Sequence, residues 1–86
     1  MFFVSEIKLT QEKIERVIVS EEYAKMGKKS VVCLLTLQNG FELFGYGSCV
    51  DPANFDMEIG KKYAREDAVN QIWKLEGYHL QCNNPF

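Results

Sequence analysis

The ten residues 47–56, with the sequence GSCVDPANFD, form the corner around which this chain is organised. An apolar hairpin pattern precedes the corner and a long helical pattern follows it. Asp51-Pro52 is typical of a turn, because Asp side chains accept hydrogen bonds from nearby backbone amides and proline presets φ for a first helical position. The stretch therefore predicts a strand-to-helix connection in which Asp51 has a structural role.

The hairpin pattern begins with Val31–Leu37, which is almost continuously apolar, as in a strand covered on both faces. Asn39-Gly40 follows and favours a two-residue type I′ turn, in which both residues need a positive φ. The next strand is expected from Phe41 to about Val50. With this loop length, Leu35 lies opposite Phe44 and Cys33 lies opposite Tyr46.

The predicted register assigns side chains to the two faces of the sheet. One face carries Cys33, Leu35, Leu37, Phe44 and Tyr46. Gly45 and Gly47 lie on the other face and leave gaps there. Glycines within a strand often mark the close approach of another backbone or of a ligand. We favour a helix packed on the two glycines and keep a ligand as the alternative.

The N-terminal part predicts a short helix and a first strand. Thr10 suits an N-cap, because its hydroxyl can accept a free N–H of the first turn. The apolar spacing that follows indicates a helix over about Gln11–Val17. Ile18–Lys25 is expected to form a strand, with a turn at residues 26–30.

After the corner, a helix is expected from about Asn54 or Asp56 to Leu75, with Gly77 as its left-handed C′ residue. Its apolar residues form two stripes on roughly opposite sides. The first stripe is Phe55, Ile59, Tyr63 and Trp73, and the second is Ala64, Ala68, Ile72 and Leu75. One stripe would suffice for a helix lying on a sheet. The second implies packing on the N-terminal helix or on another copy, and we favour a homodimer or higher symmetric oligomer.

The segment Tyr78–Cys82 alternates and predicts a last strand. Together these elements predict one α+β domain over residues 1–86. It is a small antiparallel sheet, made of the hairpin and one or two further strands. The sheet packs with one long C-terminal helix and a short N-terminal helix.

Composition excludes several classes of function. The net charge is −2 and the pI about 5.3, which disfavours generic nucleic-acid binding. The apolar start is only four residues long, so we expect neither a signal peptide nor a membrane span, and a cytosolic location. The three cysteines lack CxxC spacing, so no metal site or cofactor is predicted. No acid–base or nucleophile set is recognisable, and an enzyme is not expected.

Three polar residues near the corner are candidates for ligand binding, each beside a structural alternative. Asn54 can cap the helix, or its amide can bind a nucleobase or a ribose. Lys61 and Arg65, one helical turn apart, can clamp phosphates. Pairing with Glu58, Glu66 or the N-terminal acids is the default for such cations.

Several motifs of the chain resemble those of a small tailed-phage protein family (N4-like and Sf6-like phage accessory proteins). The resemblance lies in LTLQNGF at 35–41, GSCVDPANFD at 47–56 and IWKLEGY at 72–78, and it spans about Ser30 to Leu80. Two residues depart from the family pattern. Gly47 stands where Glu is usual, and Lys74 stands where Pro is common.

The same pattern is similar to that of the Thoeris anti-defence proteins. These are phage oligomers that bind cyclic ADP-ribose-type signals made by host TIR enzymes and hide them without cleaving them. The resemblance implies an intersubunit pocket in the cytoplasm of an infected bacterium. By motif position, Asn54 would read polar groups, Phe44 or Tyr46 would stack on adenine, and Lys61 or Arg65 would contact phosphate. The alternative is a phage protein that inhibits a host or defence protein through an exposed aromatic face.

Overall fold

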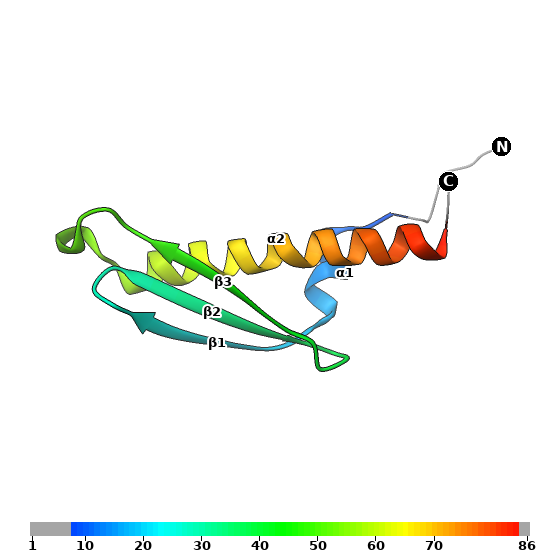
Figure 1. Cartoon of the computed structure of the whole chain (residues 1–86), viewed down its shortest axis with the longest axis horizontal. Helices are drawn as coiled ribbons and strands as arrows, with labels where there is room; N and C mark the ends of the chain where they lie inside the picture. Colours follow the sequence, from blue (N-terminus) through cyan, green and yellow to red (C-terminus); the bar gives the residue numbers. More distant parts are fainter. Residues whose placement is uncertain (1–7, 85–86) are drawn as a thin grey trace.

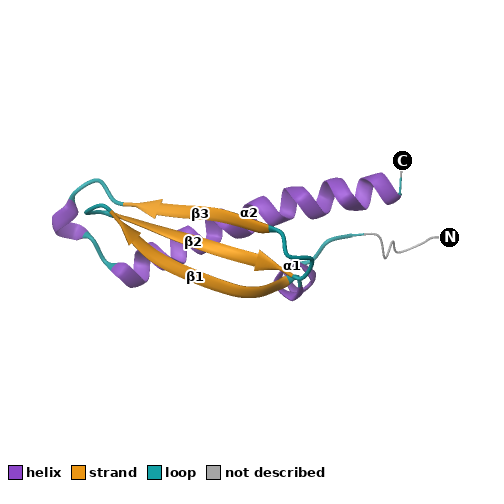
Figure 2. Ribbon diagram, turned by 60° about the horizontal axis from the view of Figure 1, so that its bottom comes forward, coloured by secondary structure: helices purple, strands orange, loops and turns teal. Residues whose placement is uncertain are grey.

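The computed structural model describes residues 8–84, and it confirms the predicted α+β class. A three-stranded antiparallel sheet in the order β1-β2-β3 lies against one long helix (Figures 1 and 2). The elements in chain order are α1 (Gln11–Arg16), β1 (Ile18–Met26), β2 (Ser30–Leu37), β3 (Glu42–Ser48), the 3₁₀ turn η1 (Pro52–Asn54) and α2 (Met57–Asn83).

The N-terminal helix and first strand form as predicted. Thr10 is the N-cap of α1, and its hydroxyl accepts a hydrogen bond from the Lys13 amide at 3.2 Å. β1 then runs one residue further than expected, to Met26. A glycine at φ +72°, Gly27, makes the turn into β2.

The hairpin between β2 and β3 differs from the prediction by one residue. Gly40 has φ +87°, and no described residue other than glycine has a positive φ, so Asn39 cannot belong to a type I′ turn. The Leu37 amide donates to the Phe41 carbonyl at 2.8 Å, and the Gly40 amide donates to the Leu37 carbonyl at 2.8 Å. The loop therefore has three residues and ends in a left-handed glycine, which is the next most common hairpin.

This longer loop shifts the register and moves β3 side chains to the opposite faces from those predicted. Leu35 lies opposite Leu43, not Phe44, and Cys33 lies opposite Gly45, not Tyr46. A one-residue slip has this effect because side chains alternate along a strand. Phe44 and Tyr46 consequently lie on the face away from α2, where they are 62% and 65% exposed.

The strand β2 is covered on one face only, so the prediction that it is covered on both faces is wrong. Its residues alternate between buried and half-buried, and the buried set is Val31, Cys33, Leu35 and Leu37. The buried residues of α2 lie against them: Ala64, Ala68, Val69 and Ile72. A continuous apolar run thus gave one core-facing row and one half-exposed row.

The helix α2 packs directly on the two glycines of β3, as favoured. A Cβ added at Gly45 would meet backbone atoms of Ala64 and Ala68, including the Ala68 Cα at 2.8 Å. At Gly47 a Cβ would lie 3.0 Å from the Gly60 carbonyl oxygen. The glycines therefore serve close approach of a helix.

The helix begins as predicted but ends later. Asp56 is its N-cap, and the Asp56 carboxylate accepts from the amides of Glu58 and Ile59 at 2.9 and 3.3 Å. The expected stop at Gly77 and the last strand over 78–82 are both wrong, because α2 continues to Asn83. One interior glycine costs only about 1 kcal/mol. The stop signal is Pro85, which disfavours helical backbone at Asn84.

Candidate functional site

The corner is built by local hydrogen bonds that give Asp51 the predicted structural role. Its carboxylate caps η1 by accepting from the Ala53 amide at 3.0 Å. The corner is also tied to the β1–β2 turn. The Cys49 amide donates to the Lys29 carbonyl at 3.0 Å, and Lys29 Nζ donates to the Val50 carbonyl at 3.1 Å.

A small hollow lies beside this corner, where β3, η1 and the first turns of α2 meet. Asn54 lies on it, exposed, and no described residue hydrogen-bonds to its side-chain amide. Because Asp56 caps α2, the capping alternative for Asn54 is wrong. The hollow has a volume of about 70 Å³. Nucleotide-sized ligands occupy pockets of about 300 Å³ or more, so the hollow of one chain is too small to enclose one.

Two residues that the sequence did not single out share this hollow with Asn54. Lys29 reaches it from the β1–β2 turn, and Tyr63 reaches it from α2 with its side chain 55% exposed. A basic, an aromatic and an amide residue thus line one hollow. The sequence predicted only a turn at residues 26–30 for Lys29 and placed Tyr63 in an apolar stripe of the helix. Two bonds between the corner and the β1–β2 turn bring Lys29 to the hollow, and the packing of α2 on β3 brings Tyr63 there.

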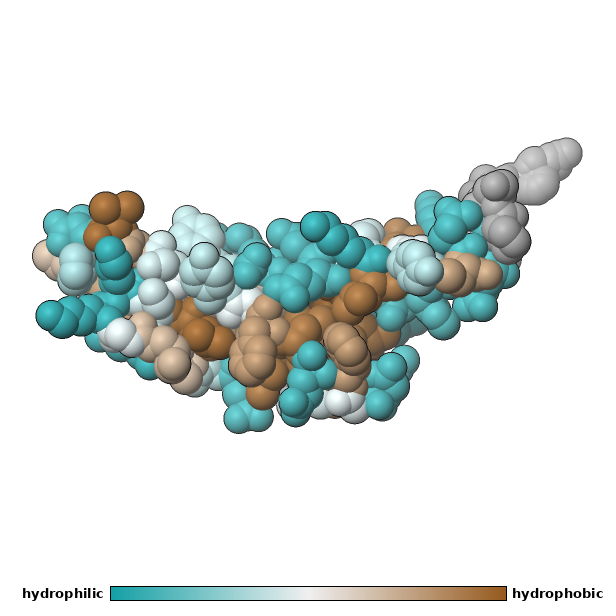
Figure 3. Space-filling view, viewed as in Figure 1, coloured by the Kyte–Doolittle hydropathy of each residue, from teal (hydrophilic) through white to brown (hydrophobic). Residues whose placement is uncertain are grey.

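The predicted aromatic residues lie on a different surface, which we call the open face of the sheet. Phe44 lies opposite Leu34 and Tyr46 lies opposite Val32, both half-buried residues of the same face. No described helix covers this face. In the space-filling view, which does not look straight onto this face, apolar side chains gather along the middle of the molecule (Figure 3). The open face therefore offers aromatic rings for stacking or for contact with a protein.

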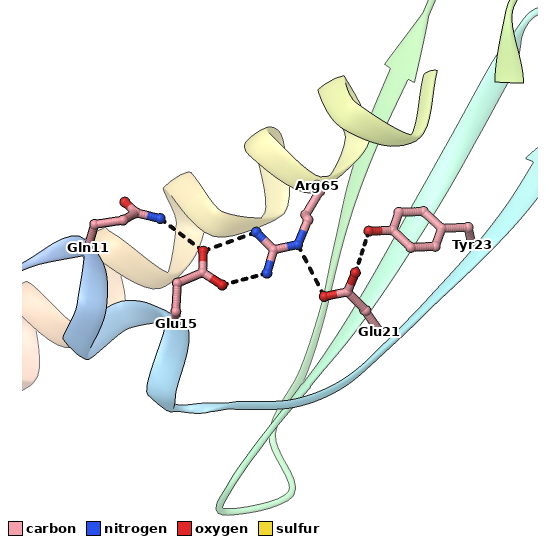
Figure 4. Close-up of polar contacts among 5 residues, drawn as sticks. All are labelled: Gln11, Glu15, Glu21, Tyr23 and Arg65. Carbon is pink, nitrogen blue, oxygen red and sulfur yellow. Dashed lines mark hydrogen bonds and ion pairs between the residues drawn. The ribbon is translucent and has the colours of Figure 1, made fainter. Parts of the chain in front are cut away.

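The predicted cations lie on the helix side of the sheet. Arg65 makes two bonds with Glu15 of α1, Nη1 to Oε2 at 3.0 Å and Nη2 to Oε1 at 2.6 Å, and its Nε bonds Glu21 of β1 at 3.1 Å (Figure 4). Lys61 Nζ lies 3.5 Å from Glu58 Oε2 and 5.6 Å from the centre of the Tyr23 ring. The default expectation of acid pairing therefore holds for both, although Arg65 pairs with acids of α1 and β1 and not with Glu66.

This ion-pair cluster shifts the acidity of its members. The hydrogen bonds from Arg65 hold the pKa of Glu15 below its usual value, against the opposing effect of burial. The bonds from Glu15 likewise raise the pKa of Arg65. Burial, helped by the hydrogen bond to Glu21, raises the pKa of Tyr23. The cluster joins α1, β1 and α2, so its first role is structural.

The five predicted ligand residues are therefore spread over three surfaces of one chain. Phe44 and Tyr46 lie on the open face, Asn54 lies at the corner, and Lys61 and Arg65 lie on the helix side. A single small ligand cannot reach all of them on one chain, because the sheet separates the first pair from the last. A site that used all five would need more than one copy.

Two side chains of α2 bond backbone groups on the outer edge of β3. The Tyr46 amide donates to the Asp67 carboxylate at 3.0 Å, and the Gln71 side-chain amide donates to the Phe44 carbonyl. These are the backbone groups that would otherwise accept a further strand. Asp67 and Gln71 are one helical turn apart, which matches the spacing of the two groups that they cover.

Within residues 8–84, no cluster of three His, Cys, Asp or Glu side chains is placed to hold a metal ion. None of the described helices has the length and apolar character needed to cross a membrane. A sequence model of the phage protein (N4 Gp49/phage Sf6 gene 66) family matches residues 9–83. No curated protein and no solved structure matches the chain.

Proposed function

Because the chain belongs to the phage protein (N4 Gp49/phage Sf6 gene 66) family, we propose that it is an anti-defence protein acting in the cytoplasm of the infected bacterium. In this proposal it binds a cyclic nucleotide signal of the cyclic ADP-ribose type and sequesters it without cleavage. The similarity of residues 30–80 to the Thoeris anti-defence proteins supports the choice of ligand class.

One observation carries the proposal. The corner presents the Asn54 amide, which bonds no described residue, in a hollow that is also lined by Tyr63 and by Lys29, whose ammonium bonds the Val50 carbonyl of the same corner. An amide can pair with a base or a ribose, an aromatic ring can stack on adenine, and a lysine can bind phosphate. The hollow has a volume of only about 70 Å³, so a second copy of the chain would complete the binding site. This requirement fits a homo-oligomeric binding protein.

The test is a thermal-shift and calorimetry series with cyclic ADP-ribose and cyclic dinucleotides as probes. Ligand at a hundred times its Kd adds about 2.7 kcal/mol of stability, which for a domain of this size raises Tm by about 10 °C or more. Heating the complex should release the probe with unchanged mass. If no probe raises Tm, the sequestration proposal is wrong, and if the probe emerges cleaved, the protein is an enzyme.

The residue-level test compares Asn54→Ala with Asn70→Ala, a matched change at an exposed helical position. Asn54→Ala should weaken binding about tenfold or more while leaving Tm of the free protein unchanged, because its amide bonds no described residue. Asn70→Ala should bind as the wild type does. Equal binding by both variants would remove Asn54 from the site.

A second candidate function is inhibition of a host or defence protein by direct contact. The exposed Phe44 and Tyr46 on the open face favour it, because aromatic residues are enriched at protein interfaces. This function predicts a stable complex with one host protein and no response to the nucleotide probes. Tyr46→Ser should abolish that complex at a cost of about 1 kcal/mol or less to the free protein, since the residue is 65% exposed.

A further inference from the structure

The two edge strands of the sheet differ in how their outward backbone groups are hydrogen-bonded. On β3, Asp67 and Gln71 bond two of the outward backbone groups, the Tyr46 N–H and the Phe44 C=O. On β1, the outermost strand on the other side, no described residue bonds to the outward backbone groups. The helix α2 packs on β2 and β3, so it leaves β1 uncovered at its edge (Figure 2).

The register identifies which β1 residues face outward. In β2 the Leu37 amide points to β3, where it bonds Phe41, so alternate residues such as Leu34 point to β1. Leu34 lies opposite Glu22. The neighbouring residues Glu21, Tyr23 and Lys25 must therefore direct their N–H and C=O groups away from the sheet. They form a row of unpaired groups ready to bond another strand.

We propose that this edge binds the β1 strand of a second copy, antiparallel, with Tyr23 on the two-fold axis, so that two chains share one six-stranded sheet. In this register Tyr23 lies opposite Tyr23 of the second copy. Glu21 lies opposite Lys25 of the second copy, and the symmetry repeats that pair. Opposite charges directly across a strand pair are stabilising.

The other symmetric registers are poorer. An axis at Glu22 sets the two Glu22 side chains directly opposite each other, and like charges in that position are destabilising. An axis at Ala24 places Lys25 opposite Tyr23 and loses the charge pairs. Charge complementarity therefore selects a second copy and one register. The inference concerns assembly and does not depend on any nucleotide ligand.

The test is sedimentation equilibrium of the full chain from micromolar to submillimolar concentration. The wild type should approach twice its 9.9 kDa mass. Lys25→Glu sets Glu opposite Glu twice and should raise the dimer Kd about tenfold or more. Lys28→Glu, the same charge change in the turn beyond the strand, should leave the Kd unchanged. A wild type that stays monomeric, or a Lys25→Glu dimer as tight as the wild type, would overturn the proposal.

Mixing two weakened variants tests the register itself. Glu21→Lys sets Lys opposite Lys, and Lys25→Glu sets Glu opposite Glu, but a mixed pair restores opposite charges at both positions. The mixture should form a heterodimer near wild-type affinity, and its absence would reject the register. If a variant fails to fold by circular dichroism, amide exchange of the wild type decides. The Tyr23 and Lys25 amides should exchange more slowly as concentration rises, and concentration-independent exchange would overturn the pairing.

Discussion

Gly45→Ala tests the contact on which the whole arrangement of sheet and helix depends. The new methyl carbon would overlap backbone atoms of Ala64 and Ala68, with the Ala68 Cα at 2.8 Å. Carbon atoms normally pack at about 3.5 to 4.0 Å. Neither obstacle is a flexible side chain, so the helix must move away from β3 by about 1 Å, a gap that forfeits a quarter to a half of each dispersion contact.

The expected cost follows from that displacement. Overpacking a core costs about 1 to 3 kcal/mol, and the backbone obstacle places this site at the upper end. Alanine returns about 0.5 to 1 kcal/mol, because glycine loses more entropy on folding. The net loss is about 2 to 2.5 kcal/mol, which lowers Tm by roughly 10 to 20 °C for a domain of this size. Thermal and urea unfolding followed by circular dichroism measure it.

Gly77→Ala is the matched control, with the same chemical change and the opposite expected sign. Gly77 lies inside α2, and among the described residues a Cβ there would meet only the Leu9 side chain at 3.9 Å, an ordinary contact. The substitution should stabilise the protein by about 0.5 to 1 kcal/mol. A Gly45→Ala variant as stable as the wild type would refute the close packing of α2 on β3. A destabilised Gly77→Ala variant would refute the continuous helix.

Three further predictions concern the polar contacts. Asp56→Ala removes the cap of α2 and should cost about 1 kcal/mol in urea unfolding, whereas an unchanged midpoint would contradict the cap. Arg65→Gln leaves Glu15 and Glu21 close together without their cation and should cost about 1 to 2 kcal/mol, a modest figure because both carboxylates are partly exposed. Because the folded-state pKa of Glu15 is lowered, its contribution is present above the unfolded value of about 4.3 and is lost as pH falls through the folded value. The urea midpoint of the wild type should therefore fall as the pH is lowered, and that of Arg65→Gln should fall less. Equal falls in the two proteins would contradict the ion pair between Arg65 and Glu15.

The hairpin illustrates how far the sequence could predict the sheet. Asn39-Gly40 correctly indicates a turn, and the two strands beside it form. The length of the loop depends on whether Asn39 adopts a positive φ, and both hairpin types satisfy the same dipeptide. Only the packing of Gly45 on Ala64 and Ala68 distinguishes them, because the shorter loop would turn Phe44 toward the helix. Register was therefore decided by tertiary contact.

The candidate site also contains residues that the sequence could indicate and residues that only the fold brings in. Asp51 and Asn54 stand out in the sequence because their residue types suit a turn and a ligand. Lys29 reaches the corner only through bonds to Cys49 and Val50, which lie some twenty residues along the chain. Arg65 and Glu15 are 50 residues apart, so their pairing has no local signal at all. Predictions from spacing reach neighbours on one helix and miss partners that only the fold brings together.

The side chains of Asp67 and Gln71 have a consequence for how this protein behaves when concentrated. A sheet can extend from copy to copy only if each copy offers two edges that can pair with another strand. Because α2 bonds the Tyr46 N–H and the Phe44 C=O, the β3 edge is less available for pairing than the β1 edge, and the proposed dimer would use the more available edge of the described sheet. The same two side chains would thus disfavour strand addition beyond the pair and extension into cross-β fibres.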